Sequence, residues 1–445
     1  MKKRYLYTVL LVITAAVLSF TIIRFNSRSS RSFYDLKDRN GPSSQTAEWV
    51  NTLKMATALA NQARMHPEDN KARLALAAVF IRESRITGDH VYYDMAAMKY
   101  VNDVLKNEPN NFEALLYKSL LFLSQHHFVD GLNTALQAQK INPYNAFVYG
   151  ILVDANVEMG NYAAAVENSD KMVSIRPDIR SYSRISYLRE IYGDYPGAIE
   201  AMKMAVEAGV PGDEATEWAR VQLGHLFENT GDLRSAEMHY TIALEQRPGY
   251  AYALAGLGNV AEGKNDYQQA IVLYTKADSM VNDYNLKEEL VDAYRNSNQE
   301  EKAAELARMV IAGLRRDAQS GRDDINIGHY ADRELAHAYL KMKDYDKALD
   351  HAFTEYNRRP ENIDVNETLA WVYYNRGEYV KALPYIQVAM KTKSKNPTLL
   401  CRAGLIYSKA GDKKMAKSLL KEGLEKNPNI TRTLKITSLD EMKAL

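Results

Sequence analysis

The chain has 445 residues and nearly balanced charge, with 57 lysines and arginines against 56 aspartates and glutamates. Its single cysteine, Cys401, excludes an intrachain disulfide, a multi-cysteine zinc site and a Cys-x-x-Cys redox motif. The charge is uneven, because residues 41–390 are acidic whereas the two ends are basic. An acidic body disfavours nonspecific binding of nucleic acid, which depends on lysine and arginine neutralising phosphate.

Residues 1–26 are predicted to hold a membrane anchor. The run from Tyr5 to Ile23 carries no charged residue and is long enough, as a helix, to cross the ~30 Å hydrocarbon core of a bilayer. It continues directly into Arg24, whereas a cleavable signal peptide usually has a shorter apolar stretch, so retention is favoured over cleavage and secretion. Basic residues flank both ends; we expect a single-pass anchor with the large domain in the periplasm or another extracytoplasmic space, and a cytoplasm-facing domain is the alternative.

Residues 27–43 are rich in serine, arginine, asparagine and glycine and have few apolar groups, so they are predicted to form a flexible tether. Such a tether would let the folded body stand off from the bilayer. An amphipathic packing helix is expected next, over residues 44–66.

From residue 70 to residue 428 the chain is predicted to be an array of helix pairs with a period of about 34 residues. The period is marked by small residues, namely Gly131, Ala165, Ala198, Ala236, Ala270, Ala303, Ala348, Ala382 and Ala416. An aromatic residue such as Tyr162 or Tyr267 precedes many of them, and a proline such as Pro177 or Pro248 follows. Glycine or alanine is needed where two helix backbones approach closely, and proline ends the second helix of a pair.

These units resemble tetratricopeptide repeats, most clearly where Leu223, Gly224, Phe227, Tyr240 and Pro248 follow the family's pattern. Ten units are expected, at 70–109, 112–143, 146–177, 179–210, 217–248, 251–282, 284–315, 329–360, 363–394 and 397–428, before a cap or tail at 429–445. The resemblance implies an all-α fold, a right-handed superhelical α-solenoid of about ten helix-turn-helix repeats preceded by one N-terminal transmembrane helix. Because each repeat of such an array contacts only its neighbours, one elongated body is expected.

The resemblance also implies that the first helix of each unit lines a concave groove, with its second, fifth, ninth and twelfth positions facing a ligand. The second and ninth positions of this chain mix aromatic and hydrogen-bonding side chains, which is the composition of an interface. The candidates for partner binding are Phe147, Tyr187, Trp218, His225, Tyr252, Asn259, Asp292, Tyr330, His337 and Trp371. The alternative is that these side chains are only solvated or stacked on their neighbours.

Chemical motifs do not support an enzyme. A near phosphate-binding loop at 258–265 ends in Asn265 where serine or threonine must ligate magnesium, so no nucleotide site is predicted. The nine histidines show no metal-ligand spacing, and we predict no metal site and no cofactor. The insertion at 316–328 is expected to be an irregular polar loop, because its acidic residues do not follow the order of a calcium-binding loop.

The sequence therefore predicts a non-enzymatic, membrane-anchored scaffold that binds a protein or peptide segment in its concave groove, as in envelope assembly or protein transport. A cytosol-facing docking receptor is the alternative, and an enzyme with an unrecognised site is a hypothesis of another class. The expected partners are a protein or peptide and, through the N-terminal helix, a membrane. Nucleic acid and small-molecule cofactors are not expected.

Overall fold

The computed structural model describes Thr14, Ser19, residues 34–323 and residues 328–445. Apart from Thr14 and Ser19, the predicted anchor lies outside the described residues and stays a prediction. In the part of the chain that is described, no helix is both long and apolar enough to span a bilayer.

The described chain is all-α, as predicted. A 3-10 helix, η1 (Gly41–Gln45), and α2 (Ala47–Met65) lead into ten helix pairs, and α23 (Arg432–Ala444) follows them. The pairs are α3 (Asn70–Thr87) and α4 (His90–Asn107), α5 (Phe112–Ser124) and α6 (Phe128–Ile141), α7 (Ala146–Glu158) and α8 (Tyr162–Ile175), α9 (Ile179–Ile191) and α10 (Tyr195–Glu207), α11 (Glu214–Asn229) and α12 (Leu233–Gln246), α13 (Ala251–Gly263) and α14 (Tyr267–Asp278), α15 (Tyr284–Asn296) and α16 (Glu300–Asp323), α17 (Asp332–Lys341) and α18 (Tyr345–Arg358), α19 (Ile363–Asn375) and α20 (Tyr379–Ala389), and α21 (Pro397–Lys409) and α22 (Lys413–Lys426). These pairs are numbered below as units one to ten.

A short polar signal separates the two helices of many units. In unit five, Gly231 takes a positive φ of 80°, which a residue with a side chain rarely adopts, and Asp232 then caps α12 by accepting a hydrogen bond from the backbone of Ser235. Aspartates cap the second helices of units four, six, eight and ten in the same way. The turn is therefore encoded locally within each repeat.

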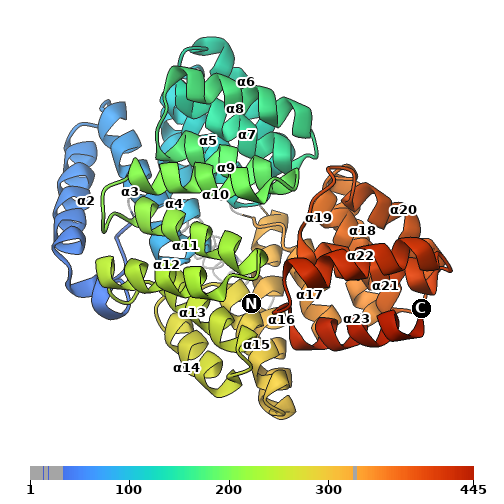
Figure 1. Ribbon diagram of the computed structural model, residues 1–445. Helices are drawn as coiled ribbons and strands as arrows, with labels where there is room; N and C mark the ends of the chain where they lie inside the picture. The colour runs from blue at the N-terminus through green and yellow to red at the C-terminus, as the bar shows by residue number, and fades with distance from the viewer. Residues whose placement is uncertain (1–13, 15–18, 20–33, 324–327) are drawn as a thin grey trace, which may run out of the picture.

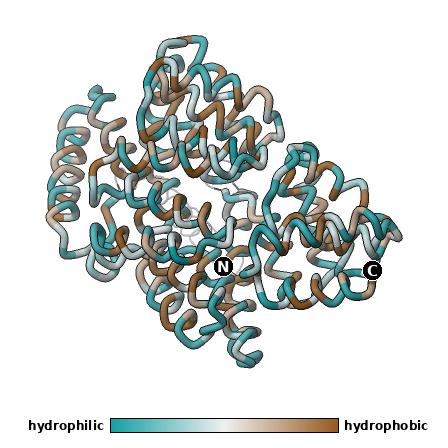
Figure 2. Tube along the Cα trace, in the orientation of Figure 1, coloured by the Kyte–Doolittle hydropathy of each residue, from teal (hydrophilic) through white to brown (hydrophobic). Residues whose placement is uncertain are grey.

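Within the units, small residues and tyrosines fit together. Tyr240 of α12 is fully buried, and a side chain at Gly224 or Gly256 would clash with its ring. Ala236 and Ala270, two of the periodic alanines, are 0% exposed. Figure 2 shows polar and apolar residues alternating along most helices, as expected for helices that bury one side. The repeat core is thus built from the residues that carry the period.

The superhelix is wound so tightly that its successive turns touch (Figure 1). Five unit-to-unit contacts make up what we name the seam. They join 87–88 to 282, 125–127 to 328–330, 157–162 to 359–363, 193 to 393–395, and 228–231 to 427–429. In the first four contacts the end of a first helix meets the residues just before the first helix six units later. In the fifth, the end of α11 meets the residues just before the terminal helix α23. The expectation that each repeat contacts only its neighbours is therefore wrong.

Polar groups make the closest approaches at the seam. The side-chain amide of Asn362 donates to the carbonyl oxygen of Glu158 at 3.0 Å, and that of Asn427 donates to the carbonyl oxygen of Glu228 at 2.8 Å. These carbonyls belong to the last turns of their helices, and the one of Glu228 also accepts a hydrogen bond from the backbone N–H of Gly231 at 2.8 Å. Gly160 also packs directly on the backbone of Glu361, where a side chain would clash. Arg359 pairs with Glu158 across the same contact.

Two loop predictions differ from the structure. Part of the predicted tether, residues 34–39, lies against α3 and α4: the backbone N–H of Tyr34 donates to the hydroxyl of Tyr100 at 2.8 Å, and buried Arg39 pairs with Glu83 at 2.6 Å. The predicted loop at 316–328 begins as helix, because α16 continues to Asp323. The sequence pattern misses both because the stabilising contacts come from elsewhere in the chain.

Candidate partner-binding surface

The ten predicted groove residues lie on the first helices of their units, with the exception of Tyr330, which precedes α17. Nine of them are half-buried, and Tyr187 is 42% exposed. They belong neither to the fully buried core nor to an open surface. This intermediate burial is consistent with the predicted inner lining.

Most of these side chains already contact other groups of the protein. Guanidinium groups lie over three of the rings, Arg180 over Phe147 at 5.0 Å, Arg85 over Trp218 at 5.2 Å and Arg402 over Trp371 at 5.0 Å. The ring of Tyr252 packs edge-on against Tyr250 at 5.6 Å, and His337 lies 3.1 Å from the hydroxyl of Thr368. The alternative of stacking on neighbours therefore describes several members of the row.

Tyr330 lies in the seam. Its backbone N–H donates to the carbonyl oxygen of Gln125 at 3.1 Å, and its ring stacks on His127 with centroids 3.9 Å apart. The guanidinium of Arg358 lies 4.0 Å from the same ring. In this structure Tyr330 joins unit two to unit eight.

Two of the predicted residues, His225 and Asn259, line a cavity of about 720 Å³ on the inner surface. One side of this cavity is formed by α9, α11, α13 and α15, and the other includes 427–432 and Lys435 of α23. The seam therefore borders the cavity, since the second side of the cavity comes from the following turn of the superhelix.

Four glutamates on consecutive first helices face this cavity, and we name them the glutamate wall. They are Glu190 of α9, Glu228 of α11, Glu262 of α13 and Glu289 of α15. The first three hold the twelfth position of their units, one of the positions that the resemblance assigns to the concave side. The predicted site residues occupy the second and ninth positions and so do not include these glutamates, although a glutamate that recurs at one repeat position is a signal in the sequence.

The wall is electrostatically crowded. Burial, together with the carboxylates of Glu289 and Asp292, raises the pKa of Glu262 to about 8. Burial likewise raises the pKa of Glu190 and of Glu289. Predicted residue Asp292 lies 2.7 Å from the ammonium of Lys341, which partly balances the charge.

Hydrogen bonding inside the cavity is incomplete. Nδ1 of His225 lies 2.9 Å from Oε2 of Glu228, and although burial opposes its charge, this carboxylate raises the pKa of His225. Asn259 accepts a hydrogen bond from the hydroxyl of Tyr274 at 2.7 Å. Oε1 of Glu228 is buried and has no hydrogen-bond partner among the described residues. The cavity therefore has unused capacity for a hydrogen-bond donor, above all a cationic one.

A second cavity, of about 1100 Å³, is lined by units one to four and by the start of α11 in unit five, and it has a different lining. It contains predicted Phe147 beside Phe112 and Leu116, together with a pair between Arg184 and Asp154 whose nitrogen and oxygen are 2.5 Å apart. Predicted Tyr187 borders a smaller cavity of about 310 Å³. The single row expected from the sequence is thus divided among separate hollows.

Comparison with known proteins supports the repeats. Residues 221–285 and 397–430 match the tetratricopeptide repeat family. Over 87 residues the chain is 32% identical to the small glutamine-rich tetratricopeptide repeat-containing protein 2 of Saccharomyces cerevisiae. The matched residues are 19% of this chain and 25% of the yeast protein. The match thus spans a quarter of the relative's length.

Three solved structures show limited similarity to this chain, one of them a TPR protein by its description. The chain is 15% identical to the APC/C hetero-tetramer Cut9-Hcn1, covering 84% of this chain and 63% of that one with a TM-score of 0.38. It is 20% identical to a thermophilic TPR protein of Thermus thermophilus. That match covers 42% of this chain and 98% of the Thermus chain, with a TM-score of 0.36. It is 14% identical to the type IV pilus biogenesis factor PilW. That match covers 45% of this chain and 92% of the PilW chain, with a TM-score of 0.38.

The chain therefore contains tetratricopeptide repeats within an all-α solenoid. Proteins built from such repeats are generally non-enzymatic scaffolds, and the fold fits a role in protein interaction.

Proposed function

We propose that this protein is a non-enzymatic scaffold that binds a basic segment of a partner protein at the glutamate wall. The observation that carries the proposal is the crowding of four glutamates in one cavity, with Oε1 of Glu228 buried and without a partner among the described residues. Lysine or arginine from a partner would supply the missing donor and relieve the repulsion that raises the pKa of Glu262.

The surrounding residues suit a polypeptide ligand. His225, Asn259 and Asn296 add hydrogen-bonding groups between the carboxylates, and Leu233 and Ile430 add apolar contacts in the same cavity. An interface that combines charge complementarity with buried hydrogen bonds selects its partner by sequence as well as by charge.

The proposal includes attachment to a membrane through residues 5–23, with the repeats on the extracytoplasmic side. The uncharged run and its flanking basic residues support it. Such a scaffold suits envelope assembly or protein transport. A reporter enzyme that is active in only one compartment, fused after Leu445, tests the orientation; activity in the cytoplasm alone favours the docking-receptor alternative.

Fluorescence anisotropy tests the binding site directly. The full-length chain in detergent is titrated into a labelled peptide of alternating lysine and leucine, and into a glutamate-leucine peptide of equal length. We expect tighter binding of the basic peptide, with an affinity that falls as salt is added. The combined variant Glu190→Gln, Glu262→Gln and Glu289→Gln should weaken binding of the basic peptide by at least about tenfold.

A charge-matched control separates the wall from the general acidity of the protein. Glu200, Glu245 and Glu305 are exposed on the second helices α10, α12 and α16, and their combined change to glutamine removes the same formal charge. This control variant should keep the affinity for the basic peptide. Equal losses in the two variants, or equal affinity for the two peptides, would show that the glutamate wall is not the binding site.

A further inference from the structure

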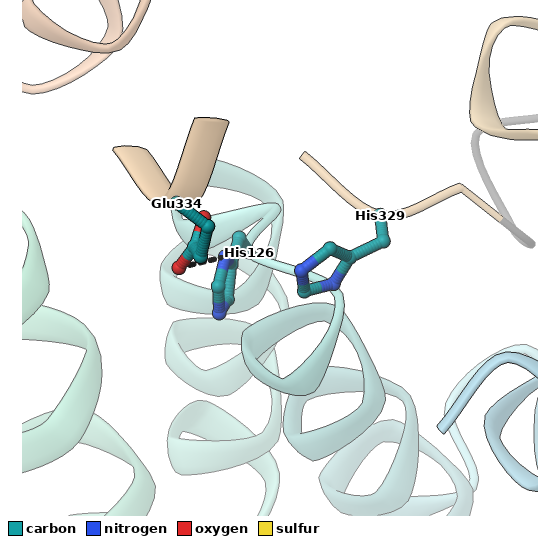
Figure 3. A group of neighbouring side chains, drawn as sticks. All are labelled: His126, His329 and Glu334. Carbon is teal, nitrogen blue, oxygen red and sulfur yellow. Dashed lines mark ion pairs between the residues drawn. The ribbon is translucent and has the colours of Figure 1, made fainter. Parts of the chain in front are cut away.

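Two histidines and a glutamate meet where unit two touches unit eight (Figure 3). His126 comes from the loop between α5 and α6, His329 from the segment before α17, and Glu334 from the first turn of α17. One candidate ligand atom from each side chain lies within 4.8 Å of the other two. Residues that are about 200 positions apart in the chain thus place three metal-ligating groups at one point of the seam.

The geometry is close to that of a bound divalent metal. Zinc binds imidazole nitrogen and carboxylate oxygen at about 2.0–2.2 Å, so neighbouring ligand atoms of a tetrahedral site are about 3.4 Å apart. Nδ1 of His126 lies 3.7 Å from Oε1 of Glu334. The rings of His126 and His329 have centroids 4.2 Å apart. Small rotations of half-buried side chains are enough to bring the three groups onto one ion.

The surroundings hold these groups in place. The ring of His126 stacks on Phe128 with centroids 5.3 Å apart. Nδ1 of His126 also lies 2.9 Å from the carbonyl oxygen of Tyr330, and an ion bound through Nδ1 would replace that hydrogen bond. Oε2 of Glu334 is buried and has no hydrogen-bond partner among the described residues. A buried carboxylate oxygen without a hydrogen-bond donor is costly, and a bound cation would remove this cost by pairing with the oxygen.

We propose that His126, His329 and Glu334 bind one divalent transition-metal ion, of which Zn²⁺ is the best match to two imidazoles and a carboxylate. Water would complete the coordination, as it does in zinc sites with three protein ligands. Because the ligands come from units six places apart, the ion binds only when the two turns are in contact. The metal then acts as a clamp on the seam, independently of any partner at the glutamate wall.

Metal titration of the full-length chain, treated with a chelator and then dialysed, tests the site. Calorimetry with ZnCl₂ should give one Zn²⁺ per chain, and His329→Gln or Glu334→Gln should each lower the affinity at least about tenfold. His126 is left unchanged, because its φ of 61° makes any substitution there a change of backbone strain as well. The matched control is His66→Gln, since His66 is an exposed histidine 3.4 Å from Glu68.

Hydrogen exchange on the unaltered chain supplies a second readout that does not depend on a variant's folding. Zn²⁺ should slow exchange of the Tyr330 amide, which donates to Gln125 across this contact, relative to the same chain with chelator. The proposal is overturned if Zn²⁺ does not bind or leaves this amide unchanged. It is equally overturned if His66→Gln lowers the affinity as much as the two site variants do.

Discussion

The core within each helix pair and the seam between superhelical turns differ in the residues that build them. In the core, Tyr240 packs on Gly224, and Tyr274 packs on Gly258 in the same way one repeat later. In the seam, Asn362 and Arg359 bind groups about 200 residues away. The periodic residues therefore determine that the chain is a solenoid. Scattered polar residues determine how tightly the solenoid winds, and so whether the cavity between its turns forms.

The largest effect is expected from breaking the core side of this comparison. Tyr240→Ala should cost about 3–5 kcal/mol, because a fully buried ring is removed and α11 and α13 cannot fill the space. The hydroxyl also lies 2.9 Å from Nδ1 of His225, so the cavity loses support. The urea midpoint measures the loss. Tyr144→Ala, at a side chain that is 81% exposed, is the control and should stay within about 0.5 kcal/mol of the parent.

A smaller effect on stability, with a different signature, is expected from breaking the seam. Arg359 is buried, with Nε 2.5 Å from Oε1 of Glu355, and it also pairs with Glu158 of unit three. Arg359→Gln should cost about 1.5–3 kcal/mol, because charged hydrogen bonds are lost. The radius of gyration from X-ray scattering should rise while circular dichroism stays the same. An unchanged radius of gyration would mean that the seam does not set the winding. The control is Lys443→Gln, which removes an exposed ion pair with Asp440 and should leave the radius of gyration unchanged.

The smallest effect concerns pH and the glutamate wall. The pKa of Glu262 is raised to about 8 in the folded chain, above the ordinary value near 4.5, so the folded state binds the proton more tightly than the unfolded state does. Stability is therefore greatest below about pH 4.5 for this group and falls as the pH rises towards 8.

Glu262→Gln removes this loss. The variant should gain on the order of 1 kcal/mol over the parent at pH 9 and nothing at pH 4, as measured by urea unfolding at each pH. Exposed Glu245→Gln is the control and should show no such pH dependence. A Glu262→Gln gain that is the same at both pH values would contradict the crowded environment of the wall.

The repeat core could be predicted from sequence because its chemistry is local. Glycine and aspartate at each turn, and an alanine every 34 residues or so, specify helix pairs whatever the rest of the chain does. The seam could not be predicted, since Asn427 and Glu228 share no pattern that links them. Gly160 and Gly231 illustrate the limit: the turn explains their conformation, but their packing against a distant unit appears only in the fold.

The candidate sites divide in the same way. His225 and Asn259 were found by repeat position, and the glutamate wall was within reach of the same method at the twelfth position. The proposed metal ligands were not, because His126 and His329 become neighbours only through the winding of the superhelix. Metal-ligand spacing is a local signal and does not detect ligands from different units.

The most direct test is a distance between unit three and unit nine in the full-length chain. Spin labels are placed at exposed Glu167→Cys and Val380→Cys, on α8 and α20. Native Cys401 is fully buried, and burial raises the pKa of its thiol to about 11, so Cys401 should not react with the label. Pulsed electron paramagnetic resonance should give one narrow distribution of label-to-label distances, centred at the distance that the wound structure gives. A broad distribution centred at longer distances would show that the seam is open and that the cavity bounded by the glutamate wall does not form.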